Sequence, residues 1–166
     1  MTDFVDAATG VFPEHAFQDM LTRETGRATR YQDLFSLCLV KPDVDEGSEE
    51  SPEEIEVAIS TKIREFVRST DMVGRLASGI AIVLLYTSGE EAIGVANRIR
   101  THIEQVTFGD RPAGRARRLT LRIGEVSFPR HGHDRQTLLV TAAQCLGHAA
   151  ERGGNRVVYA SDLEPR

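Results

Sequence analysis

The sequence predicts an α/β fold in which helices pack on one antiparallel or mixed sheet. Segments with helical periodicity alternate with short apolar segments along the chain. Turn-forming residues such as Lys41-Pro42-Asp43 and Gly153-Gly154-Asn155 separate them. The 166 residues, of which 40% are hydrophobic and 27% charged, suffice for one domain with a complete core, so a single domain over 1–166 is expected.

The first helix is expected over residues 13–31, where apolar side chains recur at helical spacing. Residues 34–40 form a short, nearly continuous apolar run, which is typical of a buried strand. We expect Pro42 to end that strand, because proline cannot donate a backbone hydrogen bond to a neighbouring strand.

An acidic segment, residues 43–56, follows and is interpreted as an exposed loop that leads into a second helix. Ser51 is a suitable N-cap, Pro52 suits the first helical position, and Glu54 completes a capping box. Acidic side chains favour a helix N-terminus, so the acidic run needs no further function.

The rest of the chain predicts four more strands and two more helices. The expected elements are, in order, strands 72–76 and 79–86 around a tight turn at Ala77-Ser78, helix 90–104, strand 119–128, helix 135–151 and strand 156–160. The sheet should therefore be flanked by helices.

Composition excludes several classes of protein. Lysine and arginine total 20 against 25 aspartate and glutamate, and a net charge of −5 disfavours non-specific nucleic-acid binding. The longest apolar run, 79–86, is too short to span a membrane, and no signal peptide is recognisable, so a cytoplasmic location is expected. Cys38 and Cys145 lie in apolar surroundings, which favours buried free thiols over a disulfide.

Several segments match known motifs in order and spacing. They are Asp-Ala-Ala-Thr-Gly at 6–10, Arg-Leu-Ala-Ser-Gly-Ile-Ala-Ile-Val-Leu-Leu at 75–85, Val-Ala-Asn-Arg-Ile-Arg at 95–100, Ile-Gly at 123–124 with Pro129, and Gly-Gly-Asn-Arg-Val at 153–157. They resemble D-x-L-T-G, R-Y-G-G-D-E-F, A-E-R-I-R, S-I-G…P and G-R-N-R-V of the GGDEF domain, the diguanylate cyclase family. The resemblance covers about residues 6–159 and implies the palm fold of nucleotidyl cyclases, with a mostly antiparallel sheet.

Active members of that family join two GTP molecules into cyclic di-GMP, which requires carboxylates that hold divalent metal ions. The family's first metal-binding aspartate falls on Lys41, and only Asp43 matches the second. The signature itself reads Ala77-Ser78-Gly79-Ile80-Ala81, so both acidic positions are lost.

The contacts to the substrate are also missing. The phosphate-binding lysine and arginine align with Ala150 and Gly154, and the guanine-binding residues cannot be placed in 44–56. The resemblance therefore implies a catalytically inactive member with no catalytic residues, no metal site and no cofactor. An active enzyme with rewritten metal ligands is a third reading, which a guanosine product made from GTP would establish.

One site of the family is retained. Arg68-Ser69-Thr70-Asp71 matches the inhibitory R-x-x-D motif, and Arg68 precedes Ala77 by nine positions, as in the family. The family adds an arginine that maps to Arg98. A guanidinium can donate to guanine O6 and N7, and an aspartate can accept from N1–H and N2–H. The alternative is a solvated helix end in which Arg68 and Asp71 form an i,i+3 ion pair.

The resemblance thus implies a cyclic di-GMP receptor in bacterial signalling that binds ligand through Arg68, Asp71 and Arg98, with ligand-linked homodimerisation as a plausible output. The alternative is an interaction or scaffold module that binds another signalling protein without nucleotide.

Other polar groups have simpler interpretations. Arg111, Arg115, Arg117 and Arg118 are taken as a solvated loop, His131 and His133 as surface turn residues, and Glu90-Glu91 as a helix N-terminus.

Overall fold

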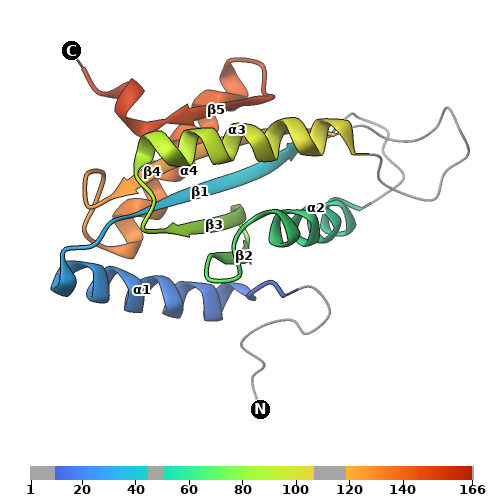
Figure 1. The fold of residues 1–166 in the computed structure, drawn as a ribbon. Helices are drawn as coiled ribbons and strands as arrows, with labels where there is room; N and C mark the ends of the chain where they lie inside the picture. The colour runs from blue at the N-terminus through green and yellow to red at the C-terminus, as the bar shows by residue number, and fades with distance from the viewer. Residues whose placement is uncertain (1–9, 45–50, 107–118, 166) are drawn as a thin grey trace, which may run out of the picture.

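The computed structural model describes residues 10–44, 51–106 and 119–165 (Figure 1). Its elements are α1 (Glu14–Tyr31), β1 (Phe35–Asp43), α2 (Pro52–Phe66), β2 (Met72–Leu76), β3 (Gly79–Leu85), α3 (Gly89–Gln105), β4 (Thr120–Phe128), α4 (Arg135–Glu151), β5 (Arg156–Tyr159) and the short 3-10 helix η1 (Ala160–Leu163). Most of the 6–10 motif and the four arginines between 111 and 118 lie outside the described residues.

The strands form one sheet in the order β2-β3-β1-β4-β5. Every pair is antiparallel except β4 with β5, which is parallel. The prediction of a mostly antiparallel sheet is therefore confirmed. Strand β1 lies in the centre and pairs with β3 on one side and β4 on the other.

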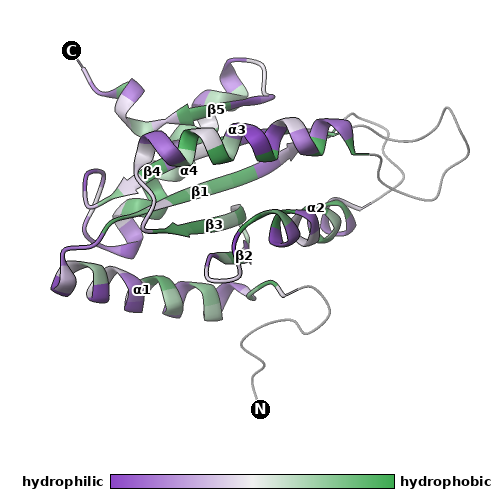
Figure 2. Ribbon diagram, in the orientation of Figure 1, coloured by the Kyte–Doolittle hydropathy of each residue, from purple (hydrophilic) through white to green (hydrophobic). Residues whose placement is uncertain are grey.

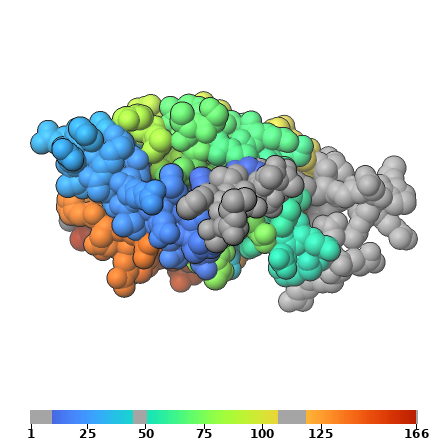
Figure 3. All heavy atoms as spheres, turned by 90° about the horizontal axis from the view of Figure 1, so that it is seen from below, coloured from blue at the N-terminus to red at the C-terminus, as the bar shows by residue number. Residues whose placement is uncertain are grey.

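Helices cover both faces of the sheet. Helices α1 and α4 enclose one core cluster, which includes Phe17, Leu37 and Val126, whereas α2 and α3 enclose another, which includes Ile59 and Ile82. Figure 2 shows mainly hydrophobic strands between helices whose outer faces are hydrophilic. Seen from below, α1 in blue and α4 in orange lie side by side (Figure 3). No described helix is both long and apolar enough to cross a bilayer.

The capping box predicted at the start of α2 is confirmed. The Glu54 backbone N–H donates to Ser51 Oγ at 3.2 Å, and the Ser51 N–H donates to Glu54 Oε2 at 3.4 Å. Pro52 occupies the first helical position. These bonds satisfy backbone donors that a helix N-terminus leaves without intrahelical partners, so the helix begins where the sequence predicts.

Strand β1 does not end before Pro42, which corrects the expectation from the sequence. It continues to Asp43, and Pro42 lies opposite Leu121 of β4. The pairing of β1 with β3 ends at Val40, so beyond that point β1 has a neighbour on one side only. A proline is tolerated there because a strand edge requires no backbone donor.

His131 is not the surface turn residue that the sequence suggested. Its side chain is only 4% exposed, its Nδ1 accepts from the Ser127 N–H at 2.8 Å, and its Nε2 lies 2.9 Å from Ser161 Oγ. The turn folds back onto η1, a contact that local sequence does not reveal. Cys38 and Cys145 are free and buried, as predicted.

Candidate functional site

A cavity of about 450 Å³ lies between the end of α2, the connection from α2 to β2, the end of β3 and helix α3. Its lining includes Arg68, Asp71 and Arg98, the three residues that the sequence analysis selected. Arg68 and Asp71 belong to the connection between α2 and β2, and Arg98 lies in the middle of α3. The structure therefore brings all three residues to one cavity, of a size usual for ligand sites.

Arg68 and Asp71 form a two-pronged ion pair. Arg68 Nε donates to Asp71 Oδ2 at 3.0 Å, and Nη2 donates to Oδ1 at 3.1 Å. The Arg68 N–H donates to Oδ2 and the Leu85 N–H to Oδ1, both at 3.1 Å. Each carboxylate oxygen thus accepts two hydrogen bonds, and the Asp71 side chain is 1% exposed. Asp71 is placed to orient Arg68, and its lone pairs are already used.

Arg68 keeps one side open to the cavity. Its Nη2 also donates to Leu85 O at 2.7 Å and to Thr87 Oγ1 at 2.9 Å, while its side chain remains 58% exposed. Within the described residues its Nη1 makes no hydrogen bond. The hydrogen bond to Asp71 raises the pKa of Arg68 above its ordinary value. The guanidinium is therefore permanently charged, and it presents its face and Nη1 to a ligand.

Arg64 of α2 supports the Arg68–Asp71 connection from behind. Its Nη1 donates to Asp71 O at 2.6 Å, and its Nη2 donates to Arg68 O. Burial lowers the pKa of Arg64 from its ordinary value. The backbone between α2 and β2 is thereby tied to the helix that precedes it, which holds Arg68 in place.

Arg98 and Glu91 supply the unpaired charges of the cavity. Arg98 is exposed, and its guanidinium has no hydrogen bond or ion pair with another described residue. Glu91 lies two turns earlier on α3, and its Oε1 accepts from Ser88 Oγ at 3.0 Å. Glu91 was not predicted as a site residue, because its position at the start of a helix already accounted for an acidic side chain. The seven-residue spacing from Arg98 was the one available signal, since it puts both residues on one helix face.

The opposite end of the sheet holds the positions where the family resemblance places its metal ligands. Asp43 accepts hydrogen bonds from Thr120 Oγ1 at 2.8 Å, Arg122 Nη1 at 3.0 Å and the Asn155 N–H at 2.9 Å. Its carboxylate thus joins β1 to β4 and to the start of β5. An aspartate already paired with an arginine is a poor ligand for a divalent cation.

The replaced signature positions are equally unsuited to a metal. Ile80 is fully buried, and Gly79 has a φ of 141° and lies so close to Val40 O that a β-carbon would be 2.6 Å from it. Among the described residues, no three His, Cys, Asp or Glu side chains gather in a way that could hold a metal ion. The residues present therefore do not fit a divalent-metal site.

Comparison with known proteins agrees with this architecture. A relative in Bacillus subtilis (strain 168), the uncharacterized protein YhcK, is 24% identical over 96% of the chain. The chain spans only 46% of that relative's length. The GGDEF domain of DgcB from Caulobacter crescentus, solved in complex with c-di-GMP, superimposes with a TM-score of 0.81 at 16% identity over 97% of this chain and 98% of that one.

A second solved structure is similar to the same degree. The GGDEF domain of PA1120 (TpbB or YfiN) from Pseudomonas aeruginosa has a TM-score of 0.81 and 22% identity, with 94% of each chain covered. At these identities the likeness establishes the fold. The family model described as "Diguanylate cyclase, GGDEF domain" matches residues 49–156, well over half of the chain. The chain is therefore a member of the GGDEF domain family.

Proposed function

We propose that this GGDEF domain is a catalytically inactive receptor for cyclic di-GMP in bacterial signalling. The observation that carries the proposal is the common cavity of Arg68 and Arg98. Asp71 orients the Arg68 guanidinium, and that of Arg98 has no partner in the part of the chain that the structure describes. A GGDEF domain of the same fold has been solved with c-di-GMP. Cyclic di-GMP is a dianion with two guanine bases, so it offers both phosphate oxygens and base edges to such groups.

Loss of catalysis is supported by the residues at the far end of the sheet. Lys41 stands where a metal-binding aspartate is needed, and Asp43 is engaged by Arg122. Ile80 is buried in the core and cannot contact a triphosphate. Phosphoryl transfer from GTP depends on metal ions that neutralise the developing charge, and these residues cannot hold them.

We infer roles for Arg68, Asp71 and Arg98 that differ from direct pairing of Arg68 and Asp71 with guanine. Arg98 is free to donate to guanine O6 and N7. Arg68 stacks its exposed face on the base and donates from Nη1 to a phosphate, because Asp71 occupies its Nε and Nη2. Asp71 is a positioning residue. Glu91, in place of Asp71, accepts hydrogen bonds from guanine N1–H and N2–H.

Calorimetric titration with cyclic di-GMP tests the proposal. The parent protein should bind saturably, and Arg98→Ala should weaken binding at least tenfold with an unchanged melting temperature, because the Arg98 guanidinium has no partner among the described residues. Arg30→Ala, which removes an arginine of α1 outside this cavity, is the matched control and should bind as the parent does. Absence of binding by the folded parent protein, or equal affinities of the two variants, would exclude the receptor.

An assay with GTP and Mg²⁺ tests the loss of catalysis separately. No cyclic di-GMP should form, and detection of the product above a protein-free control would overturn the assignment as inactive. Sedimentation velocity with and without ligand tests the further expectation that cyclic di-GMP promotes a homodimer. A monomer at saturating ligand would leave the receptor proposal intact and exclude dimerisation as its output.

A nucleotide-independent interaction module is the second candidate, and one observation favours it. Tyr31, Leu34 and Tyr86 are 62%, 41% and 60% exposed, and the Tyr86 N–H donates to Leu34 O at 3.0 Å. Exposed tyrosines beside arginines are typical of protein-interaction surfaces. If the folded domain binds no cyclic di-GMP, this candidate is tested by comparing the protein partners captured by the parent and by the Tyr86→Ser variant.

A further inference from the structure

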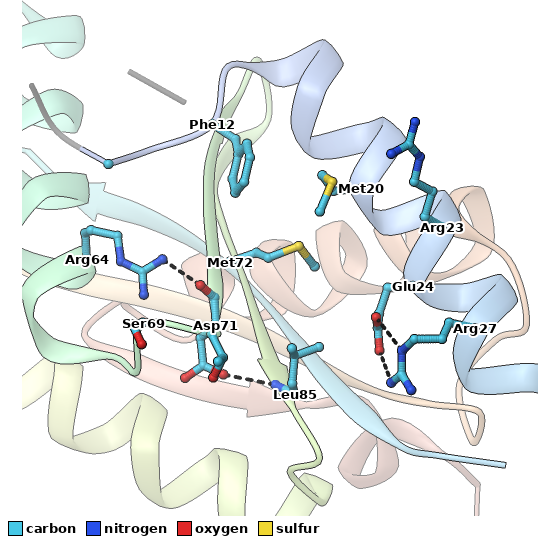
Figure 4. Close-up of a pocket in the computed structure, with 12 residues that line it drawn as sticks. Phe12, Met20, Arg23, Glu24, Arg27, Arg64, Ser69, Asp71, Met72 and Leu85 are labelled. Atoms are coloured by element: carbon cyan, nitrogen blue, oxygen red, sulfur yellow. Dashed lines mark hydrogen bonds and ion pairs between the residues drawn. The ribbon is translucent and has the colours of Figure 1, made fainter. Parts of the chain in front are cut away.

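A second cavity, of about 610 Å³, lies on the other side of the Arg68–Asp71 connection. Figure 4 shows it between α1 and α2, with Phe12, Met20 and Met72 in the middle. These three side chains and Leu85 provide an apolar floor. Methionine side chains are flexible and polarisable, so such a floor can adapt to an apolar ligand of variable shape.

The charged side chains around this floor carry more positive than negative charge. The two carboxylates in the lining are each paired with their own arginine, Glu24 with Arg27 at 2.6 Å and Asp71 with Arg68 at 3.0 Å. Arg27 also pairs with Asp33, at 2.6 Å. Both carboxylates among the described lining residues are therefore already engaged by an arginine.

Two further cations are present. Arg23 on α1 is exposed, and in the described part of the chain its side chain has no hydrogen bond or ion pair. Among the described residues, Arg64 on α2 hydrogen-bonds only to the backbone carbonyls of Asp71 and Arg68. The nearby Asp71 carboxylate does not offset the burial of Arg64, which lowers the pKa of the guanidinium. In Figure 4 Arg23 and Arg64 lie on opposite sides of the apolar floor. A partly buried guanidinium whose charge is incompletely neutralised favours an anion from outside.

We propose that this cavity binds a small amphipathic anion, a molecule with an apolar body and one acidic group. The apolar body lies on Phe12, Met20 and Met72, and the acidic group lies between Arg23 and Arg64. A volume of about 610 Å³ is sufficient for a compact organic molecule of this kind. The site shares Asp71 with the cavity of Arg98 but uses other cations, and it does not depend on cyclic di-GMP binding.

A pair of fluorescent probes tests this site on the protein as it is. 1-Anilinonaphthalene-8-sulfonate has a flat apolar body and one sulfonate, and N-phenyl-1-naphthylamine is its neutral counterpart. The anionic probe should bind saturably with one site per chain, and about tenfold more tightly than the neutral one, because two cations face its sulfonate. Melting curves run beside the titrations establish that each variant is folded.

Three variants locate the site. Arg23→Gln should weaken binding of the anionic probe about fivefold and leave the neutral probe unchanged, as expected for one partly exposed ion pair. Met20→Trp should weaken both probes by filling the floor. Arg30→Gln removes an arginine of α1 that lies outside the cavity lining, and it should change neither.

Three results would overturn the proposal: no saturable binding, equal affinities for the two probes, or equal effects of Arg23→Gln and Arg30→Gln. None of these results bears on the Arg98 cavity, which the cyclic di-GMP titration reports independently.

Discussion

Glu91 and Arg98 lie seven residues apart on one face of α3, and both line the cavity that Arg68 enters. The pair offers one acceptor and one donor group, with neither engaged in an ion pair among the described residues. A guanine base presents the complementary arrangement, with N1–H and N2–H on one edge and O6 and N7 on another. In the proposed function, helix α3 by itself therefore supplies both groups that would distinguish guanine from adenine.

Glu91→Gln should weaken binding of cyclic di-GMP by about tenfold, because a charge-assisted hydrogen bond to the base becomes a neutral one. Binding of cyclic di-AMP should not weaken, since adenine has no N1–H or N2–H to donate. Competitive titration of both dinucleotides measures this selectivity. Glu90→Gln, a neutral substitution at the adjacent exposed residue, is the control. A parallel loss for both dinucleotides would show that Glu91 does not read the base.

Asp71→Asn should lower the free energy of unfolding by about 2 kcal/mol, because Arg68 then faces a neutral amide instead of a carboxylate. This loss of stability is smaller than for a fully buried ion pair, since the Arg68 side chain is 58% exposed. Urea unfolding measures the change. Asp19→Asn, at an exposed position of α1, should change stability by less than about 0.5 kcal/mol. Equal stabilities of the two variants would contradict the role given to Asp71.

Glu125 should make the domain less stable as the pH rises. The residue is fully buried, one carboxyl oxygen has no hydrogen-bond partner among the described groups, and burial raises its pKa to about 9. Between pH 4.5, the ordinary value, and about 9, the folded state holds a proton that the unfolded state releases. The stabilisation is therefore complete below pH 4.5 and falls by about 1.4 kcal/mol per pH unit above it.

Glu125→Gln should remove this dependence, because glutamine does not titrate. Compared at pH 5 and pH 7, the parent protein should lose about 3 kcal/mol more of its free energy of unfolding than the variant does. Chemical denaturation at the two pH values measures the difference, with the half-exposed Glu104→Gln as the control. If the Glu125→Gln and Glu104→Gln proteins have the same pH profile, Glu125 does not hold a proton in the folded state.

Gly74→Ala should destabilise the domain by about 1–3 kcal/mol, the usual cost of overpacking a core. A β-carbon there would lie 2.6 Å from Cγ of Phe17, which is fully buried between α1 and β2. Gly94→Ala is the matched control, because nothing lies within 4 Å of its β-carbon in α3. That change should stabilise the helix by up to about 1 kcal/mol. The melting temperature should therefore fall for Gly74→Ala and rise for Gly94→Ala. A shift of both variants in the same direction would contradict the packing described.

The sequence alone predicted most elements of this fold, since local patterns are sufficient to define them. The capping box of Ser51 and Glu54 marks the start of α2, and the alternation from 119 to 128 corresponds to β4. The exception in β1 has a tertiary cause. Pro42 is compatible with the strand only because β3 ends its pairing at Val40, and no local pattern states where a partner strand ends.

The candidate site divides in the same way. The charges of Arg68, Asp71 and Arg98 and the loss of acidic side chains at 79 and 80 can be read from the sequence, because residue identity is local information. That Asp71 is saturated by Arg68 and the Leu85 N–H, and that Glu91 lines the same cavity, follows from the packing of the elements. Burial and pairing depend on which elements meet. The packing of α3 against the α2–β2 connection brings together residues that are far apart in the sequence, and no local pattern predicts that contact.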